Sequence, residues 1–107
     1  MASSKQYLEF VLEQLLELDD ISYRATMGEY VIYYRGKVVG GIYDDRFLVK
    51  NIKTAADLMP EAALELPYDG AKEMLLVDDV DNKAYLTDLI SSMYDELPKA
   101  KGKKKRS

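Results

Sequence analysis

The segment from Ile21 to Lys50 most constrains the fold, because its apolar residues follow the period of β-strands rather than that of helices. It is rich in Tyr, Val and Ile, which favour strands, and turn residues divide it. Four strands are predicted, over residues 21–26, 30–35, 38–43 and 46–50. Apolar side chains alternate onto both faces of the second strand, so we expect it to be central in a sheet.

Two short connections separate the later strands of this segment. One surrounds Gly36 and the other is Asp44-Asp45. Connections of this length suit tight hairpins, so consecutive strands are predicted to be antiparallel neighbours in a meander. Gly40 and Gly41 fall inside the third strand, where glycine usually marks a bulge or the close approach of another backbone.

A first helix is predicted before the strands, over residues 4–17, with Ser3 or Ser4 as its cap. Its apolar face consists of residues at helical spacing: Leu8, Val11, Leu12 and Leu15. After the strands, Thr54 followed by Asp57 can cap a short helix that Pro60 ends, and residues 73–77 predict one more strand.

A last helix is predicted over residues 82–96, with aspartates from Asp78 to Asp81 at its start, where the helix dipole favours negative charge. Its buried stripe is predicted to be Leu86, Leu89, Ile90, Met93 and Leu97. The element order α-β-β-β-β-α-β-α predicts an α+β two-layer sandwich, in which helices pack on an antiparallel meander sheet. A chain of 107 residues has room for one domain, predicted over residues 1–97, followed by a disordered basic tail over residues 98–107.

Cysteine and histidine are both absent from the chain. Disulfides, thiolate metal sites, zinc chemistry and histidine-based triads are therefore excluded. The aspartates near residue 80 lack the glycine and the terminal glutamate of a calcium loop, and Gly36-Lys37 lacks the rest of a phosphate-binding loop. We therefore expect no catalytic residues, no metal and no cofactor. Because no apolar run approaches the roughly 20 residues that span a bilayer, we expect a cytoplasmic protein without membrane contact.

Nine tyrosines accompany only two phenylalanines and no tryptophan. A tyrosine ring packs while its hydroxyl reaches water, which suits both a half-buried sheet and a protein interface. Packing within the sheet accounts for most of them. As an alternative, some form an exposed partner-binding face, for which the candidates are Tyr23, Tyr30, Tyr33, Tyr34 and Tyr43.

The last ten residues are basic, whereas the rest of the chain carries about ten more acidic than basic groups. The candidate nucleic-acid tether consists of Lys99, Lys101, Lys103, Lys104, Lys105 and Arg106. An acidic body repels nucleic acid, so we expect any such binding to be weak, nonspecific and carried by this tail. Deleting residues 99–106 should abolish a gel shift at low salt without unfolding the domain. Sequence-selective binding that survives the deletion would assign recognition to the body instead.

Several short motifs run in a fixed order through the first half of the chain. They are Met1–Lys5 leading into Tyr7–Leu15, then Arg24, Met27–Tyr30, Tyr33, Gly36–Val38 and Phe47–Lys50. With this order and spacing, residues 1–97 resemble the N-terminal domain of the TfoX/Sxy competence regulators. The positions that match characteristic residues of that domain, for which a structural role is implied, are Met27, Gly28, Tyr30, Tyr33, Gly36 and Lys50.

The resemblance implies an α+β domain similar to the secretion-chaperone-like fold, with no catalytic residues. In full-length TfoX/Sxy regulators this domain precedes a helical domain, and the protein assists the cyclic-AMP receptor protein in switching on DNA-uptake genes. The resemblance therefore implies that this chain is a bacterial transcription co-regulator in competence. Its implied partner is a protein, such as a component of the transcription machinery. The oligomeric state stays open between monomer and homodimer.

Two functions are therefore expected as alternatives. The first is a regulatory protein-interaction domain without enzyme activity. The second is a small-ligand-binding protein or an enzyme that uses a polar cleft on the sheet. The polar residues whose convergence would favour the second are Arg24, Glu29, Tyr33, Arg35 and Lys50.

Overall fold

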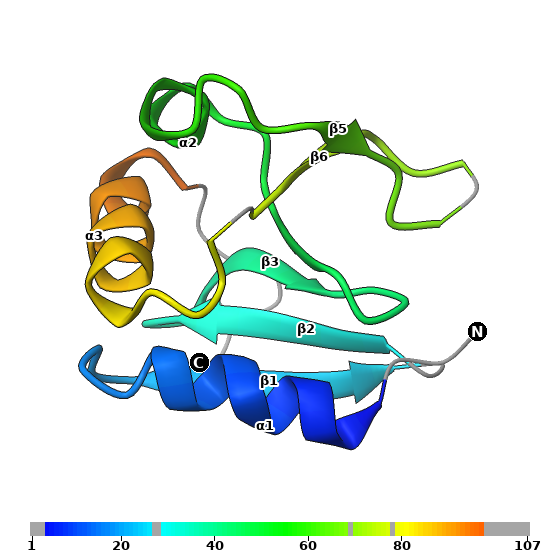
Figure 1. Ribbon diagram of the computed structural model, residues 1–107, viewed down its shortest axis with the longest axis vertical. Helices are drawn as coiled ribbons and strands as arrows, with labels where there is room; N and C mark the ends of the chain where they lie inside the picture. The colour runs from blue at the N-terminus through cyan, green and yellow to red at the C-terminus, as the bar shows by residue number, and fades with distance from the viewer. Residues whose placement is uncertain (1–3, 27–28, 69, 78, 98–107) are drawn as a thin grey trace, which may run out of the picture.

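One antiparallel sheet organises the computed structural model, which describes residues 4–26, 29–68, 70–77 and 79–97. Within these ranges the strand order is β1-β2-β3-β4-β6-β5 (Figure 1). The strands are β1 (Ile21–Thr26), β2 (Glu29–Tyr34), β3 (Lys37–Ile42), β4 (Phe47–Val49), β5 (Leu64–Glu65) and β6 (Met74–Leu76). Because β1 to β4 are neighbours in sequence order and β2 is flanked on both sides, the predicted meander and the central second strand are confirmed.

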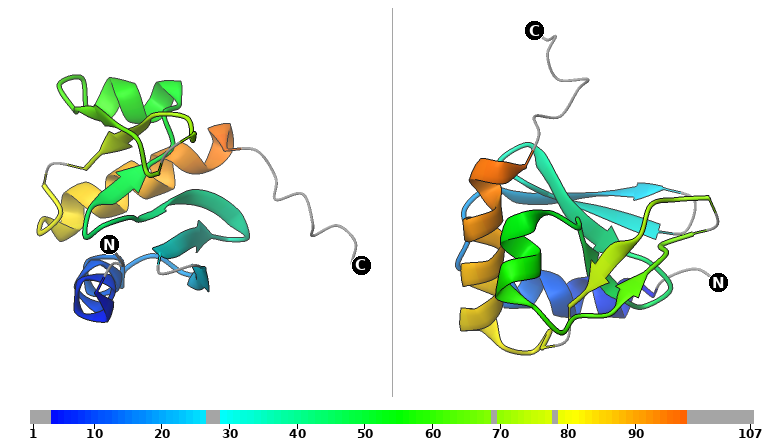
Figure 2. Two further views of the ribbon diagram at one scale, coloured as in Figure 1. Left: turned by 90° about the vertical axis from the view of Figure 1, so that its right-hand side faces the viewer. Right: turned by 90° about the horizontal axis from the view of Figure 1, so that it is seen from above.

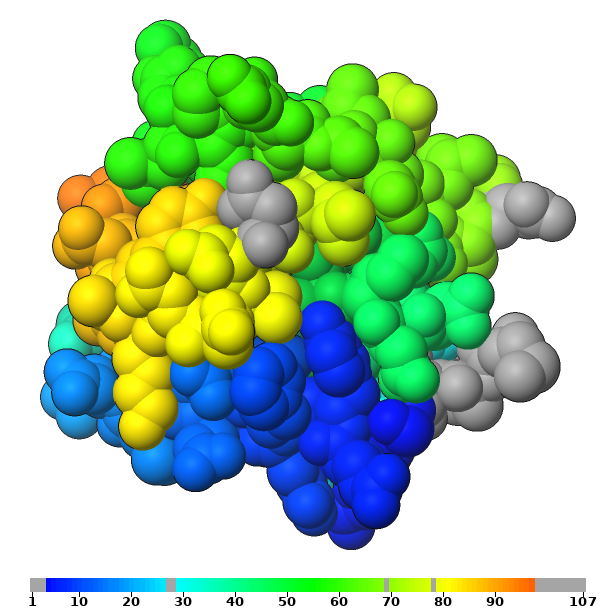
Figure 3. Space-filling view, viewed as in Figure 1, coloured from blue at the N-terminus to red at the C-terminus, as the bar shows by residue number. Residues whose placement is uncertain are grey.

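Three helices share a single hydrophobic core with the sheet. They are α1 (Lys5–Gln14), α2 (Lys53–Leu58) and α3 (Lys83–Met93), and the 3₁₀ turn η1 (Tyr94–Glu96) continues α3. In Figure 1 α3 stands at the left, with α2 above it and α1 below it. The space-filling view shows α1 and the start of α3 lying against each other (Figure 3). The predicted α+β class, with helices packed on an antiparallel sheet, is confirmed.

The core consists of apolar side chains from all three helices and from β2, β3, β4 and β6. Its fully buried large side chains include Leu8, Val11, Ile32, Phe47, Leu86, Leu89, Ile90 and Met93. All five residues of the stripe predicted for the last helix are buried. Since α1, α2 and α3 contribute to one cluster, they lie on the same face of the sheet, and the opposite face carries no helix of the described chain.

Both predicted hairpins are present, and their turns have the backbone that a two-residue connection requires. Arg35 and Gly36 have φ values of 54° and 82° between β2 and β3, and Asp44 and Asp45 have values of 55° and 57° between β3 and β4. Two successive residues in the left-handed region form a type I′ turn, whose twist matches that of the flanking strands. Asp44 and Asp45 are therefore turn residues, as predicted.

For Gly40 and Gly41 the sequence predicted a bulge or a close backbone approach, and the register places the bulge beside Gly40. Ile32 pairs with Gly40 and Tyr33 with Val38, which leaves Val39 as the extra residue. Figure 2 shows how strongly this part of the sheet bends and twists. A bulge increases the local twist of a strand pair. Gly40 also lies directly against β4, where an added Cβ atom would overlap the carbonyl oxygen of Leu48 and lie 2.7 Å from Val49 Cα.

Several predicted element ends and caps differ from those observed. Ser4 caps α1 by accepting a hydrogen bond from the Tyr7 N–H, but the helix ends at Gln14 instead of residue 17. The chain there continues in tight turns, which bring Leu15 into the core and Leu18 against it. Asn82 caps α3 by accepting from the Tyr85 N–H; among the candidate aspartates, Asp78 lies outside the described residues. The two-residue strand β5 was not predicted, because it is too short to show a period.

The predicted cap of α2 is wrong, because Thr54 lies inside that helix and its N-cap, Ile52, has no capping side chain. Glu96, at the end of η1, replaces the missing cap. Its carboxylate accepts hydrogen bonds from the backbone N–H groups of Lys53 and Thr54 at 3.1 and 2.8 Å, and from the Thr54 hydroxyl at 2.6 Å. A negative charge at a helix N-terminus is favourable, so this contact ties α2 to the end of α3.

We expect Glu96→Gln to lower the free energy of unfolding at pH 7, and this loss should shrink as the pH falls toward 3. Hydrogen bonds from the Thr54 hydroxyl, and then from the Thr54 and Lys53 N–H groups, hold the pKa of the Glu96 carboxyl below its ordinary value of 4.5. A depressed folded-state pKa gives stability that is present above the unfolded pKa and is lost as the pH falls through the folded value.

Urea denaturation of both proteins between pH 7 and pH 3 measures this difference. Glu9→Gln is the matched control, because Glu9 is exposed on α1 and makes no capping contact. A loss for Glu96→Gln that stays constant over the whole pH range would contradict the assignment.

Candidate functional site

The helix-free face of the sheet is identified by strand register. Ile32 belongs to the core, so its neighbours in β2, Val31 and Tyr33, point to the opposite face. Gly41 is paired with Val31, and Val38 is paired with Tyr33, so they lie on the same face. This face therefore carries apolar and aromatic residues although no helix covers it.

Tyr43 lies over this face because Gly41 leaves room for its ring. A Cβ atom at Gly41 would lie 2.7 Å from Cε2 of Tyr43. Tyr43 and Leu48 are both buried, yet neither belongs to the core beneath the helices. Tyr68, from the connection between β5 and β6, meets Tyr43 with ring centroids 6.2 Å apart. A second, smaller apolar layer is thus formed on the helix-free side.

Two hollows in the surface share Tyr43 and Tyr68, and we call them together the tyrosine groove. The larger has a volume of about 540 Å³, with apolar walls from Val38, Ile52, Pro67 and Met74. Its charged lining residues are Lys50, Lys72 and Glu73. The smaller, of about 430 Å³, is lined in addition by Thr26, Glu29 and Val31. Tyr68 is 61% exposed, so the groove is open to solvent along that wall.

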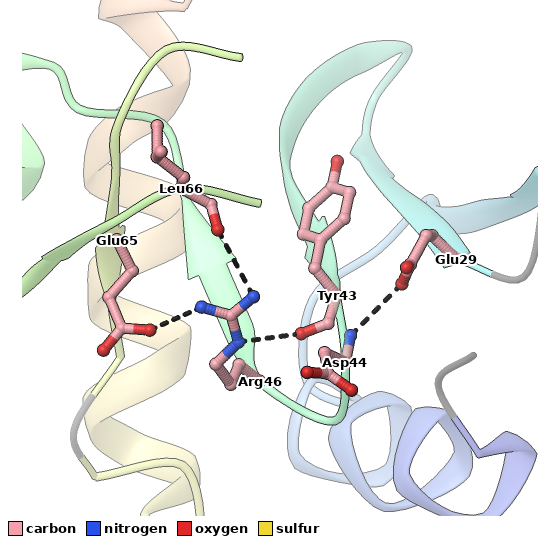
Figure 4. A network of polar contacts seen from close by, with 6 residues as sticks. All are labelled: Glu29, Tyr43, Asp44, Arg46, Glu65 and Leu66. Atoms are coloured by element: carbon pink, nitrogen blue, oxygen red, sulfur yellow. Dashed lines mark hydrogen bonds and ion pairs between the residues drawn. The ribbon is translucent and has the colours of Figure 1, made fainter. Parts of the chain in front are cut away.

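Arg46 fixes the position of the groove wall (Figure 4). From the end of the β3–β4 turn, its guanidinium donates to the Glu65 carboxylate in β5 and to the backbone oxygen of Leu66. Its Nε also donates to the backbone oxygen of Tyr43 at 3.1 Å. One side chain therefore joins the hairpin that carries Tyr43 to the segment that leads into Tyr68.

We expect Arg46→Ala to destabilise the domain by about 1–2 kcal/mol, because it removes hydrogen bonds that involve charged groups in a partly buried setting. Amide hydrogen exchange should also become faster between Leu66 and Lys72. Arg24→Ala is the control, since Arg24 is exposed on the edge strand β1. Unchanged exchange in that segment would show that other contacts hold the groove wall.

The environment of Tyr43 raises the pKa of its phenol, first through burial and then through its neighbours Tyr68, Glu29 and Tyr33. Glu29 and Tyr33 come from the strand β2, and Tyr68 comes from the connection between β5 and β6. The phenol is therefore neutral at physiological pH.

The five tyrosines predicted for a partner-binding face are divided between the two sides of the sheet. Tyr33 and Tyr43 lie on the helix-free side. Tyr23 and Tyr30 form an edge-to-face pair at 5.9 Å on the other side, opposite Ile32 and Ile42 in the strand register. Tyr34 is buried in the core, and its ring packs against Tyr94 at 5.5 Å.

Of the polar residues considered for a cleft, some lie at or beside the groove and others lie elsewhere. Glu29 lines the smaller hollow and Lys50 the larger one, and Tyr33 is close enough to Tyr43 to affect its pKa. Arg24 is exposed on β1. Arg35 lies in the first hairpin turn, where its guanidinium covers the rings of Tyr34 and Tyr94. Three of the five therefore lie at or beside the groove.

Other predicted features lie beyond the described part of the chain. The six basic tail residues, Met27 and Gly28 all lie outside it. Within it, no group of three or more acidic residues is placed to hold a metal ion, and no helix has the length and apolarity needed to cross a membrane.

Sequence reasoning did not predict three residues that shape the groove, which are Arg46, Pro67 and Tyr68. Tyr68 follows Pro67 in a stretch that reads as a loop, and an aromatic residue in such a stretch is the one signal that could have drawn attention to it. Arg46 gives no such signal, because its partners lie about twenty residues further along the chain.

One curated relative is similar to this chain over its whole length. It is an uncharacterized 12.7 kDa protein in the trpE 5′ region of Spirochaeta aurantia, 31% identical over 108 residues, which cover 100% of this chain and 94% of the relative. The chain belongs to the family of that protein. No family model matches the chain, and no solved structure matches it. The family is therefore established by sequence.

Proposed function

We propose that this chain is a non-enzymatic protein-interaction domain that holds a segment of a partner protein in the tyrosine groove. The observation that carries the proposal is the meeting of Tyr43 and Tyr68, from segments far apart in the sequence, on a face that no helix of the described chain covers. Tyrosines at the centre of a partly apolar surface are typical of the residues that dominate protein interfaces. Burial raises the pKa of the Tyr43 phenol, so this ring does not supply an anionic base in the groove.

The regulatory part of the proposal rests on the resemblance to the TfoX/Sxy N-terminal domain. The resemblance implies an α+β domain, and the observed elements are of that class, in the α-β-β-β-β-α-β-α order that the sequence pattern predicted with the short β5 added. We propose that the domain acts as a co-regulator, through contact with a protein such as a component of the transcription machinery, in the cytoplasm of a bacterium.

Affinity capture from a bacterial cell extract tests the interaction function. Tyr68→Ala should lose the captured partner, because it removes an exposed ring from the groove at little cost to stability. Tyr23→Ala is the matched control, since Tyr23 is 44% exposed on the other side of the sheet and should keep the partner. Equal capture by both variants, or no partner above background for the unmodified chain, would count against the proposal.

A small-ligand-binding protein is the second candidate function. It is favoured by the volume of the larger hollow, which lies within the range of about 300–1,000 Å³ that is usual for ligand sites. Lys50 and Asn51 would then orient a ligand between the apolar walls. Thermal shift with a metabolite library separates the two functions. A stabilising metabolite whose effect disappears in Tyr68→Ala would favour the ligand function.

A further inference from the structure

Two lysines line the tyrosine groove without an ion pair to another residue that the structure describes. Lys50 and Lys72 line the larger hollow, and neither forms an ion pair within the ranges that the structure describes. Glu73 is the one acidic residue among the described residues of this hollow, so their charged side chains are two lysines against one glutamate. The domain outside the basic tail has about ten more acidic than basic groups. A cationic lining on such a body marks this place as different from the surface around it.

Apolar and aromatic side chains line the groove together with these lysines and Glu29. Tyr43 and Tyr68 belong to both hollows, so the two hollows continue one another across the tyrosine rings. Glu29 lies on the smaller hollow, where its carboxylate also accepts a hydrogen bond from the Asp44 N–H at 3.2 Å. Among the described residues, the larger hollow thus has two lysines and one glutamate, the smaller has the Glu29 carboxylate, and the two tyrosine rings are shared. An extended chain, which advances about 3.3 Å per residue, matches such a sequence of subsites better than a compact ligand does.

We propose that the tyrosine groove binds an extended acidic segment of a partner protein, with a carboxylate at Lys50 and Lys72 and a large apolar side chain on the Tyr43–Tyr68 rings. This inference rests on the proposed interaction function and adds the chemistry of the partner. Charge complementarity at Lys50 and Lys72 favours a carboxylate at that place, because opposite charges steer and orient the partners of an interface. The chain's own tail does not fit, since residues 99–106 carry six cationic groups and no acid.

Fluorescence anisotropy with labelled peptides of about eight residues tests the inference on the full chain. The first peptide has two acidic residues beside an aromatic one, the second replaces the acids with their amides, and the third replaces them with lysines. The acidic peptide should bind the unmodified protein best. Lys50→Ala combined with Lys72→Ala should weaken it about tenfold, since each exposed ion pair contributes up to roughly 1 kcal/mol and 1.4 kcal/mol corresponds to a factor of ten.

Charge reversal provides the sharper comparison. Lys50→Glu combined with Lys72→Glu should make the lysine peptide bind better than the acidic one. Lys5→Glu combined with Lys83→Glu is the matched control, because these exposed lysines lie on α1 and α3, away from the groove, and the original preference should persist. The basic tail is present in every variant, so its attraction for acidic peptides cancels between them.

The outcomes separate the inference from the function on which it rests. Two results would contradict the acidic segment and leave the interaction function standing. In the first, the peptides bind through Tyr68, but the preference for the acidic peptide does not depend on Lys50 and Lys72. In the second, no peptide binds, while capture of a partner still depends on Tyr68. If capture does not depend on Tyr68, the interaction function itself fails. Concentration-dependent dimerisation that Tyr68→Ala abolishes would place a second copy in the groove and would overturn the acidic partner.

Discussion

Gly40→Ala is expected to destabilise the domain by about 3 kcal/mol or more, which is a large part of the roughly 5–15 kcal/mol that holds a domain folded. The added methyl group would overlap the Leu48 carbonyl oxygen and crowd Val49 Cα, and both are backbone atoms of β4. A side chain can rotate away from such an overlap, but a paired strand can move only if its hydrogen bonds to β3 and β6 are disturbed.

Urea denaturation measures the loss as a shift of the unfolding midpoint. Gly36→Ala is the matched control, because Gly36 has a φ of 82° but no atom within 4 Å of the added Cβ. It should cost only about 1 kcal/mol, the usual price of a left-handed backbone for alanine. If Gly40→Ala proved no more destabilising than Gly36→Ala, β3 and β4 could not approach as closely as described.

Phe47→Ala is expected to cost about 3–5 kcal/mol, because it empties a large volume in a core that cannot collapse around it. Phe47 begins β4, is fully buried, and packs in the cluster to which all three helices contribute. Its backbone oxygen also accepts from the Val77 N–H at 3.0 Å, so the strand is fixed at this point and the cavity would persist.

Differential scanning calorimetry and urea denaturation both measure this effect. Leu16→Ala is the control, because Leu16 is 70% exposed and its loss should change stability by no more than about 0.5 kcal/mol. The milder Phe47→Leu keeps most of the volume and should give a folded protein with a loss of about 1.5 kcal/mol. A Phe47→Ala protein as stable as Leu16→Ala would contradict the position of Phe47 at the centre of the core.

The tyrosine groove divides into parts that the sequence predicted and parts that it did not. Tyr33, Tyr43, Glu29 and Lys50 were singled out as chemistry-bearing residues, and all four lie at or beside the groove. The side of the groove that Tyr68 forms was not predicted, because Tyr68 reaches Tyr43 only when the β5–β6 connection folds over β3 and β4. Polarity and residue type are local properties, whereas the meeting of two loops depends on the path of the whole chain.

The sequence by itself determined the elements that depend on neighbouring residues. The period of two over Ile21 to Lys50 produced the four-stranded meander, the turn residues at Gly36 and Asp44 produced its hairpins, and helical spacing produced the buried stripe of α3. Each of these features arises within a few residues, where backbone sterics and side-chain alternation leave few choices.

Only the tertiary structure decided which groups that are far apart in the sequence make contact with one another. Glu96 caps α2 although it lies 42 residues further along the chain than Thr54, β5 joins the sheet beyond β6, and Arg46 links the hairpin of Tyr43 to the segment before Tyr68. These contacts leave no periodic trace in the sequence, because the two partners lie far apart along the chain. Their formation depends on the packing of the core, which brings the two ends of each contact within reach.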